Sequence, residues 1–215
     1  VIVNDHFILN YVHCFGGPDA AHPSFTTIQK SINFSMTSIL TTGGIRGGKN
    51  SIDKFQPRSF NMGISKKAFI ESKGFGTIHP GEDPDLTFRL WKLGFKTSLI
   101  KEAYVFHKRR ISWAKFYNQV NKFGKVRPIL NTWHPETKRI TYWLPSLFII
   151  GLLIAIVQAL IFQNYGFLII YGFYFLLLFI VSLFYNSNFL VALNSIIAVI
   201  IHVNIDFKGI TEKRS

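Results

Sequence analysis

Long runs of apolar residues fill the C-terminal third of the chain. The stretch YWLPSLFIIGLLIAIVQALIF covers residues 142–162, and GFLIIYGFYFLLLFIVSLFY covers residues 166–185. Each run has about the twenty apolar residues that a helix needs to cross the hydrocarbon core of a bilayer. Only three residues separate the runs, so the pair is predicted to form an antiparallel helical hairpin. A helical pair buried in a soluble protein is the alternative, which two adjacent uncharged runs of this length disfavour.

A third apolar run, FLVALNSIIAVIIHV at residues 189–203, is shorter and contains Asn194 and His202. We predict a third membrane span here, with a re-entrant or interfacial helix as the alternative. The two polar residues could mark a functional path through the membrane. A hydrogen bond to a neighbouring helix is the commoner role of such residues.

Residues 1–140 show a different pattern, in which short β-rich runs alternate with helical periodicity. YVHCF leads into the turn signal GGPDAAHP, and extended chain is predicted again in FKTSLIKEAYVFH. Apolar residues recur at helical spacing after the first turn, at Ile28, Ile32, Met36 and Ile39. Further helices are predicted at residues 65–73 and 83–94, with a long Gly-bearing loop at residues 45–60. This mixture predicts an α/β layer rather than a helical bundle.

From Ser112 the pattern becomes that of an amphipathic helix, and Pro128 is predicted to limit its end. Bulky apolar residues form one stripe, with lysines off it, at Trp113, Phe116, Tyr117, Val120 and Phe123. Such a helix directly before a membrane span suits a bilayer surface with anionic lipid. Packing of the stripe on the protein itself is the alternative.

Charge divides the chain near residue 140. Residues 1–140 hold 21 Lys and Arg against 9 Asp and Glu, whereas no charged residue lies between Arg139 and Asp206. The strongly basic segment at residues 101–139 directly precedes the first apolar run, so this flank is predicted to be cytoplasmic. The tail DFKGITEKRS is also basic, which conflicts with three spans. Membrane topology and lipid headgroups explain the charge better than nucleic acid, so no nucleic-acid partner is predicted.

Cysteine usage excludes an internal disulfide, because Cys14 is the only cysteine. No paired Cys/His spacing indicates a structural zinc site, and Cys14 is predicted to be a small buried apolar residue. The opening residues VIVNDHFILN lack an initiator Met and a signal-type run, and they resemble the interior of a domain. We therefore expect the chain to be a fragment whose upstream part is missing.

Three carboxylates crowd into the stretch GEDPDLTFRL at residues 81–90. Asp83 as N-cap, followed by Pro84 and Asp85 in the first turn, would make a good helix start with no function. Glu82 does not fit that explanation, because it precedes the cap and adds repulsion. Close carboxylates can instead hold one of them as a general base, since a neighbouring negative charge raises its pKa. A metal-binding pair is a further alternative.

The segment GEDPDLTFRLWKLGFKTSLIKEAYVFHKRR resembles the catalytic-base region of inverting family 2 glycosyltransferases. Upstream, FGGPDAA, TTGGIRGG and SFNMGISKKAF resemble the Gly-rich core and acceptor-side loop of that family. Downstream, FYNQVNKFGKVRP and the apolar runs resemble its membrane-attached bacterial members. The resemblance implies an α/β fold: a partial GT-A (Rossmann-like) domain at residues 1–111, an interfacial helix and linker at 112–140, and a transmembrane helical region at 141–215.

The same resemblance implies transfer of a sugar, in hexosyltransferase fashion, from a nucleotide-sugar to a lipid-linked or polysaccharide acceptor, with inversion. Asp83 would take the proton from the acceptor hydroxyl, Glu82 would tune it, and Asp85 would fix the helix start. The implied acceptor-binding residues are Asn61, Gly63, Asp85, Gln119 and Arg127. The implied diphosphate-binding residues are His107, Arg109 and Arg110. An ordinary strand-end role for His107 and a positive-inside role for the two arginines are the alternatives.

A divalent metal, Mg or Mn, is also implied, because charge develops on the leaving diphosphate. Its main Asp-x-Asp ligand pair is expected upstream of Val1, since none occurs before Gly16, and His107 is a weaker candidate ligand. DPD at residues 83–85 has that spelling but lies in the base region. The chain is therefore expected to be inactive without its nucleotide-binding half.

Two functions follow as competing hypotheses. The first is a multi-pass enzyme of the inner (cytoplasmic) membrane, with its soluble part in the cytoplasm, serving polysaccharide biosynthesis for the cell envelope. The second is a non-enzymatic membrane adaptor that binds anionic lipid through HKRR and the aromatic helix.

Overall fold

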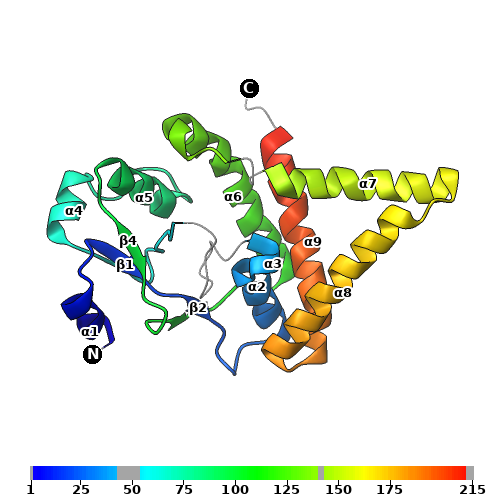
Figure 1. The fold of residues 1–215 in the computed structure, drawn as a ribbon, viewed down its shortest axis with the longest axis horizontal. Coiled ribbons are helices and arrows are strands. Elements are labelled where there is room, and N and C mark those ends of the chain that lie inside the picture. The colour runs from blue at the N-terminus through cyan, green and yellow to red at the C-terminus, as the bar shows by residue number, and fades with distance from the viewer. Residues whose placement is uncertain (1, 43–53, 140–142, 212–215) are drawn as a thin grey trace. The chain divides into compact units, whose positions relative to one another are not determined.

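The computed structural model describes residues 2–42, 54–139 and 143–211 (Figure 1). The chain divides into two compact units. Unit 1 comprises residues 1–25 and 36–109, and unit 2 comprises residues 26–35 and 110–215. Most of the Gly-bearing loop predicted at residues 45–60 lies outside the described residues.

Unit 1 is built on short strands. β1 (Cys14–Gly16) lies between β3 (Met62–Ile64), which is antiparallel to it, and β4 (Thr97–Leu99), which is parallel. β2 (Asp19–Ala20) pairs in parallel with β5 (Val105–Phe106). The predicted extended segments are confirmed, but each strand has only two or three residues. The Rossmann-like part of the predicted fold class is therefore not confirmed.

Helices α4 (Lys66–Glu71) and α5 (Glu82–Lys92) cover the three-stranded sheet, and α1 (Ile2–Leu9) and α3 (Ile39–Thr42) complete unit 1. Ser65 caps α4 by accepting a hydrogen bond from the Ala68 N–H. The core of the unit brings together residues from β1, α4 and α5, namely Cys14, Ala68, Leu86 and Leu90. The sheet therefore packs against α4 and against α5, whose first turn is the carboxylate-rich stretch.

Gly63 serves the close contact between β1 and β3. It lies opposite Phe15 in the register, and a Cβ atom at Gly63 would lie 2.1 Å from the Phe15 ring. A side chain there would displace the ring, because packed atoms do not approach so closely. Packing therefore explains this glycine, and its predicted role in acceptor binding stays a prediction.

The Cys14 thiol is expected to be unreactive in the native protein. It is fully buried, and burial raises its pKa to about 12, so very little thiolate is present at neutral pH. We expect slow labelling by iodoacetamide in the folded chain and rapid labelling in denaturant, measured by mass spectrometry. Rapid stoichiometric labelling of the native chain would contradict the buried position of Cys14.

Unit 2 is helical. It contains most of α2 (Thr27–Thr37), then α6 (Trp113–Trp133), the short 3-10 helix η1 (Pro135–Thr137), α7 (Leu144–Phe162), α8 (Gly166–Asn186) and α9 (Phe189–Thr211). Helix α9 packs against α6, α7 and α8. Phe34 of α2 joins Leu178 and Val199 in a buried cluster. The Ser31 hydroxyl donates a hydrogen bond to the Val191 carbonyl at 2.9 Å, which fixes α2 on α9.

Helix α6 begins as predicted, with Ser112 as its N-cap, but the predicted stop at Pro128 is wrong because the helix continues to Trp133. A proline inside a helix removes one backbone hydrogen bond. Burial of Val126 and Leu130 on either side of Pro128 holds the helix together across it. Phe116 and Val120 of the predicted stripe are also fully buried, so the centre of the stripe packs on protein. Lipid contact by the rest of the stripe stays a prediction.

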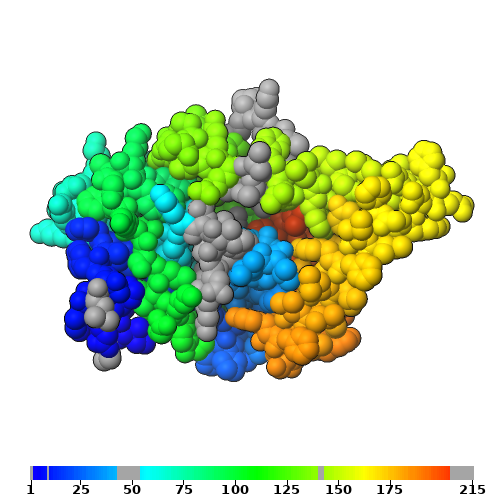
Figure 2. Space-filling model, in the orientation of Figure 1, coloured from blue at the N-terminus to red at the C-terminus, as the bar shows by residue number. Residues whose placement is uncertain are grey.

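Helices α7 and α8 are long and apolar enough to cross a membrane, judged by length and composition. They meet at the right-hand tip of Figures 1 and 2 through the three-residue connection that the sequence predicts. The Tyr171 hydroxyl of α8 donates to the Phe148 carbonyl of α7 at 2.9 Å. The Ser182 and Ser195 hydroxyls lie 2.8 Å apart and link α8 to α9. Such hydrogen bonds are a usual means of holding helices together in lipid.

Helix α9 contains the third apolar run, and its apolar part, Phe189–Val203, is shorter than a full membrane span. His202 is buried, and its ring lies edge-on to Phe116 of α6, with the ring centroids 6.5 Å apart. This ring contact packs His202 on a neighbouring helix, and the hydrogen bond expected for such a polar residue stays a prediction.

Candidate functional site

The carboxylate-rich stretch forms the first turn of α5, but its cap is not the one predicted. The helix begins at Glu82, and Gly81 occupies the N-cap position with φ of +121°. The predicted N-cap role of Asp83 is therefore wrong. Gly81 permits this earlier start because a residue without Cβ adopts positive φ at little cost. The first helical hydrogen bond then runs from the Asp85 N–H to the Gly81 carbonyl, at 3.0 Å.

This shift of the N-cap by two residues leaves the Asp83 carboxylate available for a contact outside the helix. Its Oδ1 accepts a hydrogen bond from the backbone N–H of Ser59 at 3.1 Å. Burial raises the pKa of Asp83, and the positive charge of Arg58 and the Ser59 hydrogen bond oppose that rise. A carboxylate that is partly desolvated yet held by a donor has the properties of a general base.

Glu82 affects Asp83 in the predicted direction. Its negative charge raises the pKa of Asp83, although burial is the largest cause and Glu82 is the smallest. The Glu82 carboxylate lies 3.2 Å from Nδ1 of His79, whose ring is exposed. The predicted tuning by Glu82 therefore has a physical basis but a small size.

Asp85 is buried and forms an ion pair with Arg89. Its Oδ2 accepts from Nη2 of Arg89 at 2.7 Å and from Nε at 3.1 Å. Arg89 also donates to the Ser72 carbonyl at the end of α4. Asp85 therefore lies in the first turn of α5, as predicted, and it also holds Arg89, which links α5 to α4. Its predicted acceptor contact stays a prediction.

A tight turn at residues 58–61 presents the Ser59 N–H to Asp83. The Asn61 N–H donates to the Arg58 carbonyl at 2.8 Å, and the Asn61 side-chain amide donates to the Ala103 carbonyl at 3.0 Å. Gly17 makes room beside this contact, because a Cβ atom there would lie 1.7 Å from the Ala103 oxygen. Asn61 therefore holds the turn in place, and the acceptor binding predicted for it stays a prediction.

Replacing Asn61 by alanine is expected to destabilise the protein by about 1 kcal/mol, because it removes one internal hydrogen bond. Thermal unfolding of the chain in detergent measures the change. Asn118→Ala, at an exposed position of α6, is the matched control and should change stability by no more than about 0.5 kcal/mol. Equal effects of the two substitutions would show that the Asn61 amide does not hold the turn.

A buried ion pair in unit 1 feels the charge of Arg58 in this turn. Nη2 of Arg109 is 2.6 Å from Oδ2 of Asp19, and both side chains are almost completely buried. Burial raises the pKa of Asp19 and lowers that of Arg109, while the charge of each partner opposes the shift. Arg109 is 6% exposed, so its burial and its ion pair with Asp19 give it a structural role. The diphosphate contact predicted for it stays a prediction.

Arg58 was not singled out by the sequence, yet its charge acts on Asp83, Asp19 and Arg109. The charge of Arg58 thus influences both the candidate base Asp83 and the buried Asp19–Arg109 ion pair. The only sequence signal for Arg58 is a basic residue just before the SFNMG segment, which is weak in a chain this basic.

The remaining candidates are dispersed. The His107 ring packs edge-on to Phe60, with centroids 4.0 Å apart, and its backbone N–H donates to the Ala20 carbonyl, as for an ordinary strand-end residue. Arg110 is exposed at the first position of the second segment of unit 2. Gln119 and Arg127 lie on α6, also in unit 2. The roles predicted for these four residues stay predictions.

The described residues do not fit a resident divalent metal. Among them, no group of three His, Cys, Asp or Glu side chains could hold an ion. The His107 ring contacts Phe60, and Asp19 is paired with a cation. The Mg or Mn predicted to bind upstream stays a prediction.

Comparison with known proteins identifies a family for the chain. Residues 59–203 match a family model described as glycosyl transferase family group 2, and this range covers well over half of the chain. It includes the turn at residues 58–61 except for Arg58, all of α5, and the helices α6, α7 and α8. No curated protein and no solved structure matches the chain.

Proposed function

Because the chain belongs to glycosyl transferase family group 2, we propose that it supplies the acceptor-side and base-bearing part of a membrane-attached inverting glycosyltransferase. The family implies a nucleotide-sugar donor and an acceptor. We place a lipid-linked or polysaccharide acceptor on the side of Asp83. The proposal rests on the Asp83 carboxylate, which lies in the matched region. Burial raises its pKa, and the Ser59 N–H donates a hydrogen bond to it.

In the proposed reaction, Asp83 accepts the proton of the acceptor hydroxyl while that oxygen attacks the anomeric carbon of the donor sugar. The bond from this carbon to the diphosphate oxygen breaks on the opposite face, so the configuration inverts. Ser59 orients the carboxylate, and the charge of Arg58 keeps its pKa from rising further. A base works best when its pKa lies near the pH at which the protein operates.

We further propose that α7 and α8 anchor the protein in the inner (cytoplasmic) membrane, with the basic flank at residues 101–139 on the cytoplasmic side. This topology would expose the base to soluble nucleotide-sugars on the cytoplasmic side of the membrane. It is consistent with a role in polysaccharide biosynthesis for the cell envelope.

The number of spans follows from the position of the C-terminus. If α9 is the third span that the sequence predicts, a reporter enzyme fused after Ser215 should lie on the side of the membrane opposite to residues 101–139. An alkaline phosphatase fusion would then be active and a green fluorescent protein fusion dark. The reverse result would show two spans and an α9 that stays on the cytoplasmic side.

The proposed function is tested by sugar transfer in membranes that contain the complete protein. Membranes incubated with a panel of radiolabelled nucleotide-sugars should incorporate label into lipid or polymer, and the product linkage should show inversion by NMR. Retention of configuration would contradict the mechanism. A non-enzymatic membrane adaptor would give the same incorporation as membranes that lack the protein.

A further inference from the structure

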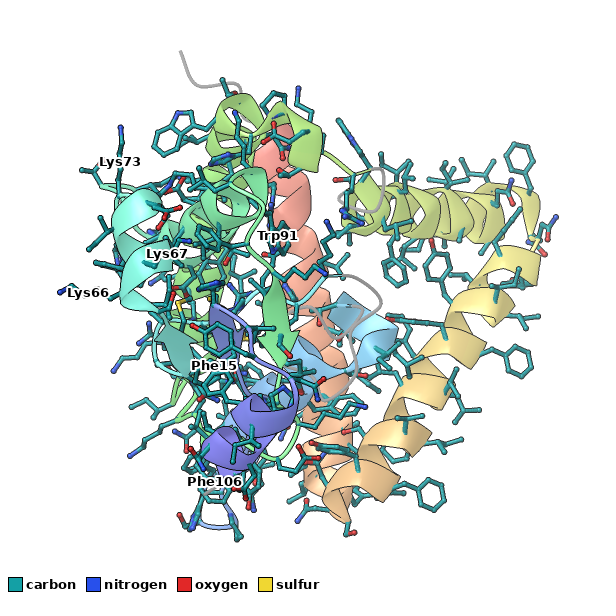
Figure 3. All side chains as sticks on the ribbon, turned by 60° about the vertical axis from the view of Figure 1, so that its left-hand side comes forward. Phe15, Lys66, Lys67, Lys73, Trp91 and Phe106 are labelled. Carbon is teal, nitrogen blue, oxygen red and sulfur yellow. The ribbon has the colours of Figure 1, made fainter. Side chains whose placement is uncertain are left out.

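Exposed lysines and large apolar side chains share the outer face of α4 and of the turn that follows it in unit 1. The apolar members are 39%, 63% and 45% exposed, at Phe69, Ile70 and Phe75. We name this surface the α4 patch, and its six residues are Lys66, Lys67, Phe69, Ile70, Lys73 and Phe75. Figure 3 labels the three lysines of the patch, which come from α4 and from the turn that follows it.

The fold fixes which face of α4 is turned outward. Ala68 is fully buried against Leu86 and Leu90, so the Ala68 face of the helix packs on the core. Lys66, Phe69 and Ile70 follow one another at the spacing of neighbours on one helix face. The exposed apolar side chains are therefore held at the surface by packing on the opposite side of a short helix.

The turn after α4 adds Phe75 to the patch. The Gly74 N–H donates to the Phe69 carbonyl at 2.9 Å, and Gly74 has φ of +61°. A Cβ atom at Gly74 would lie 2.8 Å from the Phe69 ring, so only glycine lets the ring lie over the turn. The Phe69 and Phe75 rings are 6.1 Å apart and form one apolar surface between lysines.

We propose that the α4 patch docks on the anionic headgroup surface of a membrane. Protein surfaces that lie at the headgroup boundary of a membrane combine lysines with large apolar side chains. The apolar side chains enter the interface, and the ammonium groups contact lipid phosphate. The patch has three lysines, and Glu71 is the one acidic residue of α4. The net charge of this surface is therefore positive.

The rest of the chain supports this partner. Helices α7 and α8 are apolar enough to cross a membrane, and unit 1 is covalently joined to them. A tethered surface binds at a high effective concentration, so contacts that are weak alone become significant. Association of two patches with each other is disfavoured, because it would bring six lysines together.

The test is fluorescence quenching of the complete chain in nanodiscs. A fluorophore is attached to Ile70→Cys, or to Ile8→Cys as a matched exposed isoleucine on α1 of the same unit. Cys14 is buried with a raised pKa, so the unsubstituted chain serves as the labelling control. The discs contain a headgroup-level nitroxide lipid, with phosphatidylcholine alone or together with phosphatidylglycerol. Circular dichroism verifies that each variant is folded.

We expect stronger quenching at residue 70 than at residue 8 in anionic discs, and less at residue 70 in neutral discs. Combining Lys66→Glu, Lys67→Glu and Lys73→Glu should reduce quenching at residue 70 to the level at residue 8. Loss of the three lysine charges alone should lower the partition coefficient of the patch to an anionic surface roughly a hundredfold.

Equal quenching at the two sites in anionic discs would overturn the proposal, as would quenching at residue 70 that survives the charge reversals. A blue shift at residue 70 without quenching would show that protein covers the patch instead. The experiment does not depend on sugar transfer, so its outcome is independent of the proposed enzymatic function.

Discussion

Replacing Asp83 by asparagine is expected to lower sugar transfer by the complete protein about 10²–10⁴-fold, the usual contribution of a general base. Asparagine has nearly the same shape, and its carbonyl oxygen can still accept the Ser59 hydrogen bond, but it cannot take the acceptor proton. Initial rates of transfer from labelled nucleotide-sugar measure the loss. Binding of the nucleotide-sugar should remain close to that of the unsubstituted protein, because the change is at the acceptor side.

The pH dependence of transfer gives a second readout of the same residue. Burial raises the pKa of Asp83, and a base must be deprotonated to act, so the rate should rise with pH through this raised pKa. Arg58→Gln removes the positive charge that opposes the rise. The acidic limb of the pH profile should therefore move to higher pH, and Arg58→Lys should restore part of it.

Stability should change in the opposite sense to activity. The folded-state pKa of Asp83 lies above the unfolded value of about 3.9, so its contribution to stability is present below that value and is lost as the pH rises through the folded-state pKa. Asp83→Asn should therefore unfold at a higher temperature than the unsubstituted chain at neutral pH, and the difference should vanish in acid. In the transfer assay, near-normal turnover of Asp83→Asn would show that Asp83 is not the base.

Replacing Arg109 by methionine is expected to destabilise the protein by about 3–5 kcal/mol, because Asp19 would remain as a buried charge without its partner. Combining Arg109→Met with Asp19→Leu removes both charges, and stability should return to within about 1 kcal/mol of the starting value or exceed it. Denaturant unfolding followed by circular dichroism measures each free energy.

The neighbouring arginine provides the control for this experiment. Arg110 is exposed, so Arg110→Met should change stability by no more than about 0.5 kcal/mol. If Arg109→Met behaves like Arg110→Met, the ion pair does not hold unit 1 together. If the combined substitution is as unstable as Arg109→Met alone, the loss comes from packing rather than from the unpaired charge.

The sequence predicted those features of the fold that depend on neighbouring residues. The apolar runs of α7 and α8, the Ser112 cap of α6 and the extended segments around Cys14 and Thr97 all follow from local composition and periodicity. Errors arose where tertiary contacts outweigh local preference. Helix α6 passes through Pro128 because residues on both sides are buried, and α5 starts early because Gly81 takes a conformation that its neighbours do not dictate.

Some features of the candidate site also follow from the sequence, and others follow only from the tertiary structure. The sequence by itself determined the crowded carboxylates of Glu82, Asp83 and Asp85 and the order of the family's motifs, since both are properties of the linear chain. The tertiary structure alone decided what each carboxylate meets. The Ser59 N–H reaches Asp83 across 24 residues, and Arg109 reaches Asp19 across 90. Burial and charge pairing at such separations arise only when the chain folds, so no local pattern could distinguish the candidate base Asp83 from the structural ion pairs.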